Sequence, residues 1–186
     1  MRFAMDKLIA GAAELGIRLD DQQADMFRLY YEDLVDWNRR VNLTSVVDYK
    51  DVQVRHFLDS LTAAPLVGSE SSRVIDIGSG AGFPGVPLKI ALPGMELTLV
   101  ESVNKKAVFL RHLVGRLALD GVEVAAVRAE TLAHDGRYRQ GYDIAISRGV
   151  AALSTLAELS LSFCTVGGRF IAMKKGDIAD EVASSA

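Results

Sequence analysis

A glycine-rich turn is the segment of this sequence best suited to hold a ligand. Val74–Ile77 reads as a short buried strand, and it runs directly into residues 78–85, whose sequence is GSGAGFPG. Because glycine has no Cβ, the backbone of such a turn can approach a bound molecule closely. In an open parallel sheet, ligands bind beyond the carboxyl ends of the strands, where the strand order reverses. We therefore expect the main binding site at the end of this strand.

Two classes of cofactor compete for this turn. A dinucleotide fingerprint, G-x-G-x-x-G, that starts directly after the strand requires glycine where the chain has Phe83, and the pattern fits only from Gly80 onward. The alternative is an acidic residue two positions before the first glycine, followed by G-x-G-x-G. Asp76, Gly78, Gly80 and Gly82 supply that pattern. It resembles motif I of Rossmann-like methyltransferases, in which the turn lies against the amino-acid part of S-adenosylmethionine.

Carboxylates follow the next two expected strands. Glu101 lies 23 residues after Gly78 and directly follows an expected strand. A carboxylate there can accept hydrogen bonds from both ribose hydroxyls of an adenosine. Ala129 and Glu130 follow the third strand, where such enzymes read the edge of the adenine. For both glutamates the alternative interpretation is a solvated acid in a loop.

The rest of the second part of the chain predicts an α/β fold. The expected strands are Val74–Ile77, Leu97–Val100, Val122–Val127, Tyr142–Ile146 and Arg169–Met173. The expected helices are Val86–Leu92, Lys105–Leu119 and Ala151–Phe163, with a turn of helix near Thr131. This alternation predicts a parallel sheet with helices on both faces.

Residues 1–67 lack the alternation of a strand and read as helices. Asp20 and Gln23 form a capping box at the start of a long amphipathic helix, whose aromatic residues are expected in the core. Asp48 marks the start of a second helix. We expect residues 1–67 to be a helical extension that packs on a Rossmann-like core at residues 73–186, the two being joined by the polar segment 68–72.

Several motifs in a fixed order are more specific than the glycine turn. They are Asn38, Asn42–Ser45, Arg55–Ser60, Ile75–Gly85 and Ile146–Arg148. Over about residues 30–175 they resemble the bacterial 16S rRNA guanine-N7 methyltransferase G family, also called glucose-inhibited division protein B. The resemblance implies a class I fold that transfers a methyl group from S-adenosylmethionine to a guanine N7 of 16S RNA, releasing S-adenosylhomocysteine. It also implies that the cofactor contacts Gly78, Phe83, Ala129, Glu130 and Arg148.

The side chains near the expected cleft agree with this chemistry. Guanine N7 has an exposed lone pair and no proton to lose, so the transfer needs alignment more than a general base. The segment after the fourth strand, Ser147-Arg148-Gly149, lacks the Asn/Asp-Pro-Pro-aromatic turn that is typical of amine methylation. Methylation of a pyrimidine C5 needs a cysteine nucleophile near the site, but Cys164 lies before the fifth strand, away from the expected cleft. Arg148 is the one catalytic candidate, and it can face a phosphate or the cofactor carboxylate, or cap the next helix.

Contact with RNA requires a local patch, because the net charge of −3 gives no global basic field. Arg137, Arg139, Lys174 and Lys175 are candidates for one basic rim, with a merely solvated cluster as the alternative. In the Arg55–Asp59 segment, Arg55 and Asp59 are spaced to pair across one helical turn. We expect Arg55, His56 and Asp59 to pack the amino-terminal helices onto the sheet, and the alternative is a direct catalytic role in which His56 touches the cleft.

The remaining features bound where the protein acts and with what. No export signal or bilayer span is visible, and one cysteine suits a reducing compartment, so we expect a cytoplasmic monomer without metal or membrane. Its partner would be 16S rRNA or the 30S particle. Family chains continue with further strands after Met173, so we expect the carboxyl-terminal strands to be missing. Two alternatives remain: a methyltransferase of another substrate class, and a noncatalytic cofactor-binding module associated with the ribosome.

Overall fold

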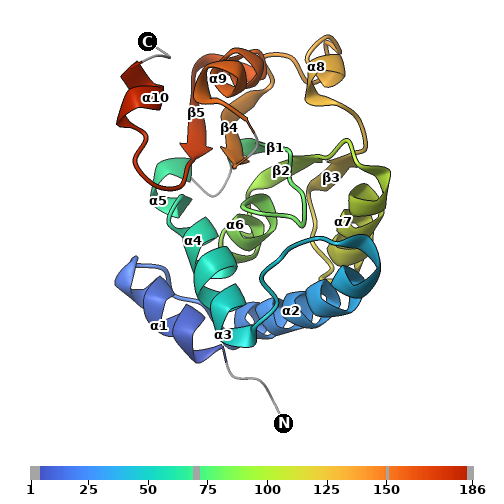
Figure 1. Ribbon diagram of the computed structural model, residues 1–186, viewed down its shortest axis with the longest axis vertical. Helices are drawn as coiled ribbons and strands as arrows, with labels where there is room; N and C mark the ends of the chain where they lie inside the picture. The colour runs from blue at the N-terminus through green and yellow to red at the C-terminus, as the bar shows by residue number, and fades with distance from the viewer. Residues whose placement is uncertain (1–4, 69–71, 150, 184–186) are drawn as a thin grey trace.

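A parallel five-stranded sheet forms the centre of the computed structural model, which describes residues 5–68, 72–149 and 151–183 (Figure 1). Its strands lie in the order β3-β2-β1-β4-β5. They are β1 (Arg73–Ile77), β2 (Glu96–Val100), β3 (Val122–Ala125), β4 (Tyr142–Arg148) and β5 (Cys164–Met173). The chain moves outward from β1 to β2 and β3, and then returns to the other side of β1 for β4. The carboxyl end of β1 is therefore the point where the strand order reverses, as expected for a ligand site.

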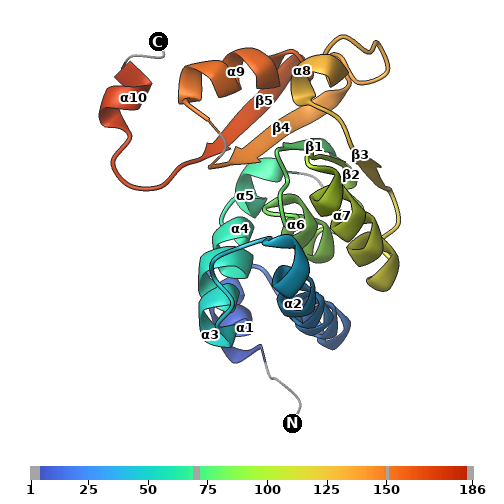
Figure 2. The same ribbon diagram turned by 45° about the vertical axis from the view of Figure 1, so that its right-hand side comes forward.

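Helices cover both faces of the sheet, as the alternating pattern predicts. They are α6 (Gly85–Ala91), α7 (Asn104–Arg116), α8 (Ala129–Leu132) and α9 (Leu153–Leu161), whereas α10 (Ala179–Ala183) follows β5 and has no buried residue. Side chains that alternate along the strands feed two separate apolar clusters. Val74, Leu97 and Leu99 pack with α6 and α7, whereas Ile75 and Ile77 pack with the α8 side. Figure 2 shows α6 and α7 on one side of the sheet and α8 and α9 on the other.

The chain before the sheet is helical and shares the α6–α7 core. Its elements are α1 (Asp6–Glu14), α2 (Asp21–Val41), α3 (Tyr49–Val52), the π-helix η1 (Gln53–Leu58), α4 (Asp59–Leu61) and α5 (Ala64–Val67). The capping box is confirmed, because the Asp20 carboxylate accepts the Gln23 backbone N–H at 2.7 Å. Phe27, Tyr30 and Leu34 of α2 are fully buried against the elements that follow.

Several local features differ from the sequence-based expectation, and β3 and α9 are both shorter than expected. Strand β5 begins at Cys164 rather than Arg169, because pairing with β4 resumes after a register shift between Tyr142 and Ile144. The helix expected after Asp48 contains the π-helix η1, which the apolar spacing did not indicate. Residues 69–71 of the expected connector lie outside the described residues. Within the described part of the chain, no helix is long and apolar enough to cross a membrane.

Candidate functional site

The glycine turn lies at the carboxyl end of β1 and is fastened to β2. The backbone N–H groups of Gly78 and Ser79 both donate to the carbonyl of Val100, at 2.9 and 3.0 Å. Gly78, Gly80 and Gly82 have φ angles of +72°, +59° and +97°, in the region that glycine adopts without strain. A Cβ at Gly80 would have no neighbour closer than 3.9 Å, so a bound molecule can lie directly against this backbone.

Asp76 holds the far end of the turn from inside the protein. Its Oδ2 accepts the backbone N–H of Gly85 at 2.9 Å, while the buried Oδ1 has no hydrogen-bond partner within the described structure. A Cβ at Gly85 would lie 2.8 Å from Oδ2, which explains glycine at that position. Burial raises the pKa of Asp76 to about 7, although the Gly85 N–H opposes this rise. Asp76 therefore shapes the turn.

Glu101 links the turn to the end of β2. Its Oε2 accepts the N–H of Gly80 at 2.9 Å and its Oε1 accepts the N–H of Val103 at 2.7 Å, with the residue only 6% exposed. A carboxylate offers about four lone-pair positions, so each oxygen keeps one for a ribose hydroxyl. The predicted ribose contact is compatible with this geometry, and the structure adds a role in holding Gly80. The open backbone and this acceptor set fit an S-adenosyl group.

The Phe83 side chain joins the glycine turn to the amino-terminal helices. The His56 ring stacks on it with centroids 4.6 Å apart, and the Arg148 guanidinium lies 4.9 Å from its centroid. Arg148 also donates to Asp59 at 2.9 Å. The expected Arg55–Asp59 pair is wrong, because Arg148 takes Asp59 and Arg55 pairs with Asp51 at 3.6 Å instead. Helix-face spacing alone does not reveal such a partner from a distant strand.

Tyr30 is a site residue that the sequence analysis assigned only to the core. Its hydroxyl donates to the carbonyl of Ala81 at 2.5 Å, and its ring stacks on Phe83 with centroids 5.3 Å apart. A Cβ at Gly82 would lie 2.7 Å from this hydroxyl. Helix α2 therefore fixes the glycine turn directly. The polar tip of an otherwise buried tyrosine was the available signal, because a buried tyrosine hydroxyl needs a hydrogen-bond partner.

The remaining cofactor candidates lie on the same edge of the sheet. Ala129 and Glu130 form the first turn of α8, on the carboxyl side of β3, where Ala129 is buried and the Glu130 side chain is exposed. Arg148 is the last residue of β4. The topology thus brings these three residues, the glycine turn and Glu101 to one edge, and their contacts with the cofactor stay a prediction.

The four cations proposed for one basic rim are not brought together. Arg137 and Arg139 precede β4 and lie at its amino end, whereas Lys174 and Lys175 follow the carboxyl end of β5. Arg137 pairs with Asp135 at 2.7 Å and Lys174 pairs with Glu181 at 2.7 Å. A single rim is therefore wrong, because parallel strands separate residues that precede one strand from residues that follow the next.

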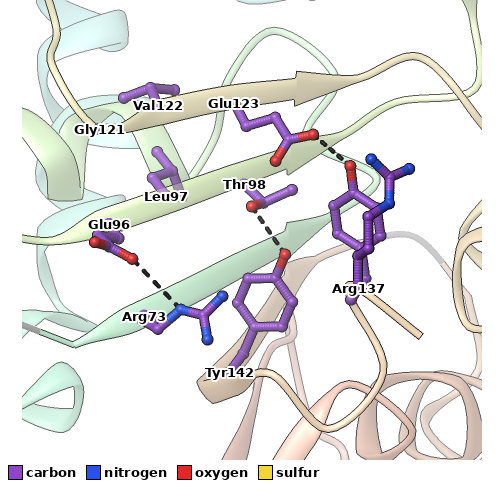
Figure 3. A pocket seen from close by; sticks show the side chains of 10 residues that line it. Arg73, Glu96, Leu97, Thr98, Gly121, Val122, Glu123, Arg137 and Tyr142 are labelled. Atoms are coloured by element: carbon purple, nitrogen blue, oxygen red, sulfur yellow. Dashed lines mark hydrogen bonds and ion pairs between the residues drawn. The ribbon is translucent and has the colours of Figure 1, made fainter. Parts of the chain in front are cut away.

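A cavity of about 460 Å³ lies at the amino ends of the strands, away from the glycine turn (Figure 3). Arg73 and Glu96 form an ion pair at 3.4 Å on its wall, and the Tyr142 hydroxyl donates to Thr98 at 3.0 Å. Arg137 also lines it. Its place at the amino ends separates it from the carboxyl-edge site.

Replacing Asp76 by asparagine should change how stability depends on pH. The folded protein holds the Asp76 proton up to about pH 7, whereas the unfolded chain releases it near pH 3.8. The protonated carboxyl therefore contributes to the stability of the wild type at low pH, and this contribution is lost as pH rises through that window. Relative to wild type, Asp76→Asn should gain on the order of 2–4 kcal/mol in unfolding free energy between about pH 4 and 7. Urea unfolding from pH 4 to 8 without ligand measures this gain.

The comparison with wild type matters because His56 titrates in the opposite sense. Burial lowers the pKa of His56 to about 4, so its contribution to stability grows as pH rises from about 4 to 6.5. The Asp76→Asn difference cancels this background. A difference that stays constant from pH 4 to 8 would contradict the raised pKa of Asp76.

A family model and individual relatives that are similar in sequence to this chain carry the same description. Residues 23–186 match the family described as rRNA small subunit methyltransferase G. The chain is 50% identical over 184 residues to the ribosomal RNA small subunit methyltransferase G of Dehalococcoides mccartyi (strain CBDB1), covering 98% of this chain and 77% of that protein. For the protein of the same name from Roseiflexus castenholzii (strain DSM 13941 / HLO8), identity is 51% over 178 residues, covering 96% and 76%.

The fold is also found in a solved structure of more distant sequence. A SAM-dependent O-methyltransferase from Thermotoga maritima is similar with a TM-score of 0.55 and 18% identity, over 82% of this chain and 53% of that one. This likeness and the strand order show the Rossmann-like fold of class I methyltransferases. With the family match over residues 23–186, it follows that the chain belongs to the rRNA small subunit methyltransferase G family.

Proposed function

We propose that this protein transfers the methyl group of S-adenosylmethionine to N7 of a guanine in the 16S RNA of the small ribosomal subunit. The observation that carries the proposal is the glycine turn at the strand-order reversal, closed by Asp76 and Glu101, in a chain 50% identical to a protein named as a ribosomal RNA small subunit methyltransferase. When bound, the donor supplies a sulfonium-activated methyl group. The turn fits the donor because its backbone is open above Gly80.

The protein's part in the reaction is to position the reactants. Glu101 holds Gly80 in place and retains acceptor positions for the ribose. Asp76 fixes the turn from the protein interior and Tyr30 fixes it from α2, so the donor meets a preorganised surface. Because N7 has no proton to remove, alignment within the site supplies the catalysis without a general base. Arg148, which pairs with Asp59, lies beside Phe83 at the same edge.

We propose the two domains that the sequence indicates, each with its own role. Residues 1–67 act as a helical extension that supports the turn, and residues 73–186 carry the donor site. The Tyr30–Ala81 hydrogen bond and the shared apolar core support this division. The proposed RNA substrate places the protein in the cytoplasm, with free 16S RNA or the 30S particle as its partner.

Methylation with labelled S-adenosylmethionine tests the proposal directly. Unmodified 16S RNA, naked or in 30S particles, should receive label at one guanine, which cleavage specific for N7-methylguanine then maps. A 16S transcript made with 7-deazaguanosine is the matched control, because it lacks the accepting atom and should receive no label. Label on the 7-deaza transcript, or no label on any RNA although the donor binds, would overturn guanine-N7 methylation.

A further inference from the structure

The Arg148 side chain leaves the sheet beside the glycine turn. Strand β4 pairs with β1 in parallel register, with Asp76 opposite Ile146. The same register, continued by two residues, places Arg148 beside Gly78, the first residue of the turn. The guanidinium carbon of Arg148 lies 4.9 Å from the ring centroid of Phe83, which belongs to the same turn. Arg148 is therefore within reach of a molecule that lies on this turn.

The amino-terminal helices fix the orientation of this guanidinium. Its Nη1 donates to Oδ2 of Asp59 at 2.9 Å and to the carbonyl of Arg55 at 3.4 Å. Its Nη2 lies 3.3 Å from Nδ1 of His56. The Phe83 ring adds a cation–π contact, which favours a guanidinium above the ring face. Among these contacts the ion pair with Asp59 is the shortest.

Part of the guanidinium remains available to a ligand. It has five N–H donors, and Asp59, Arg55 and His56 account for three of them at most. Nδ1 of His56 lies 3.0 Å from the Arg55 carbonyl, so both contacts lie at the Nη1–Nη2 end. The Nε–H and the second Nη2–H have no hydrogen-bond partner among residues 5–68, 72–149 and 151–183. Two neighbouring donors of this kind match the two oxygens of a carboxylate or a phosphate.

Attachment of the helices to the sheet does not by itself account for the Asp59 contact. The Asp59 side chain is 50% exposed, and ion pairs with such exposure contribute little to stability. Phe57 and Leu61, two residues to either side of Asp59, are fully buried in the core that the helices share with α6 and α7. These apolar side chains attach the segment, so the ion pair mainly directs Arg148.

We propose that Asp59 is a positioning residue for methyl transfer, which holds the Arg148 guanidinium over Phe83 so that its two free N–H groups bind an oxyanion at the glycine turn. This inference rests on the proposed function. That reaction brings two oxyanions to this edge, the carboxylate of the donor and a phosphate of the RNA, and both accept a guanidinium through paired hydrogen bonds. Asp59 acts only through Arg148.

Replacing Asp59 by alanine tests this role. Asp59→Ala should weaken binding of one of the two ligands by about tenfold or more, because charge-assisted hydrogen bonds from Arg148 would lose their alignment. Calorimetry gives the Kd for S-adenosylmethionine, and fluorescence anisotropy gives the Kd for unmodified 16S RNA. A loss in the first assigns the carboxylate, and a loss in the second assigns the phosphate. The urea midpoint of unfolding should change little.

A double-mutant cycle separates positioning from a general structural role. In the Arg148→Ala background, Asp59→Ala should change the affected Kd by no more than about twofold, because the group that it positions is already absent. A purely structural role would instead reduce affinity by the same factor in both backgrounds. Additive losses in the double variant would therefore contradict the proposal.

Asp51→Ala is the matched control. Asp51 is an acid of similar exposure in α3, and it pairs with Arg55 at 3.6 Å rather than with Arg148. Its removal should leave both Kd values within about twofold. Equal losses in Asp51→Ala and Asp59→Ala, or unchanged Kd values for both ligands in Asp59→Ala, would overturn the positioning role. Neither binding measurement needs turnover, so failure of methylation in the wild type would count against the proposed function alone.

Discussion

Replacing Glu101 by alanine should weaken binding of S-adenosylmethionine by about 3 kcal/mol or more, roughly a hundredfold in Kd. The variant loses the acceptors proposed for the ribose and also releases the Gly80 and Val103 N–H groups. Hydrogen bonds to a charged group contribute about 1.5–3 kcal/mol each, so two losses suffice. Isothermal titration calorimetry measures the effect.

Two further variants show which part of Glu101 matters. Glu101→Gln keeps the shape but offers an amide NH₂ where an acceptor is needed, so its affinity should lie between those of wild type and Glu101→Ala. Glu130→Ala removes an exposed acid at the same edge and should have the smaller effect. An unchanged donor Kd in Glu101→Ala would overturn the ribose assignment and the importance of the Gly80 contact together.

Replacing Gly82 by alanine should destabilise the protein by about 3 kcal/mol and abolish tight donor binding. The φ angle of +97° is unfavourable for alanine, and the added Cβ would lie 2.7 Å from the Tyr30 hydroxyl and 2.9 Å from Val86. Relief of this contact would move the turn away from α2. Chemical denaturation gives the free energy of unfolding, and calorimetry gives the donor Kd.

Gly115→Ala is the matched control for this substitution. Gly115 is exposed in α7, where a Cβ would meet nothing within 4 Å. The same change should there increase the free energy of unfolding by about 0.5–1 kcal/mol, because alanine favours a helix more than glycine does. Equal signs for the two substitutions would contradict the geometric argument at Gly82.

The sequence predicts the framework of the site because regular patterns encode it. Alternating strands and helices indicated the parallel sheet, and the glycine pattern with Asp76 located the turn at the strand-order reversal. The capping box fixed the start of α2 to the residue. These features depend on neighbours in sequence, so spacing and residue type are sufficient to find them.

The parts that sequence reasoning missed depend on contacts between distant segments. Arg148 pairs with Asp59, which lies 89 residues away in the chain, and no local pattern announces that choice. Tyr30 looks like any buried aromatic residue of a helix stripe until its hydroxyl is seen at Ala81. The π-helix η1 and the early start of β5 likewise arise from packing and register rather than from residue preference.

The hydrogen bond from Tyr30 to Ala81 joins the stability of α2 to affinity for the donor. A ligand that binds only the ordered turn must also favour the docked helix, and linkage makes this relation reciprocal. Loosening α2 on its buried side, at Phe27 or Leu34, should therefore reduce donor affinity without altering any atom that touches the donor. Amide exchange along α2 would slow on donor binding for the same reason. The exchange rate of this helix would therefore report how much of the donor site is occupied.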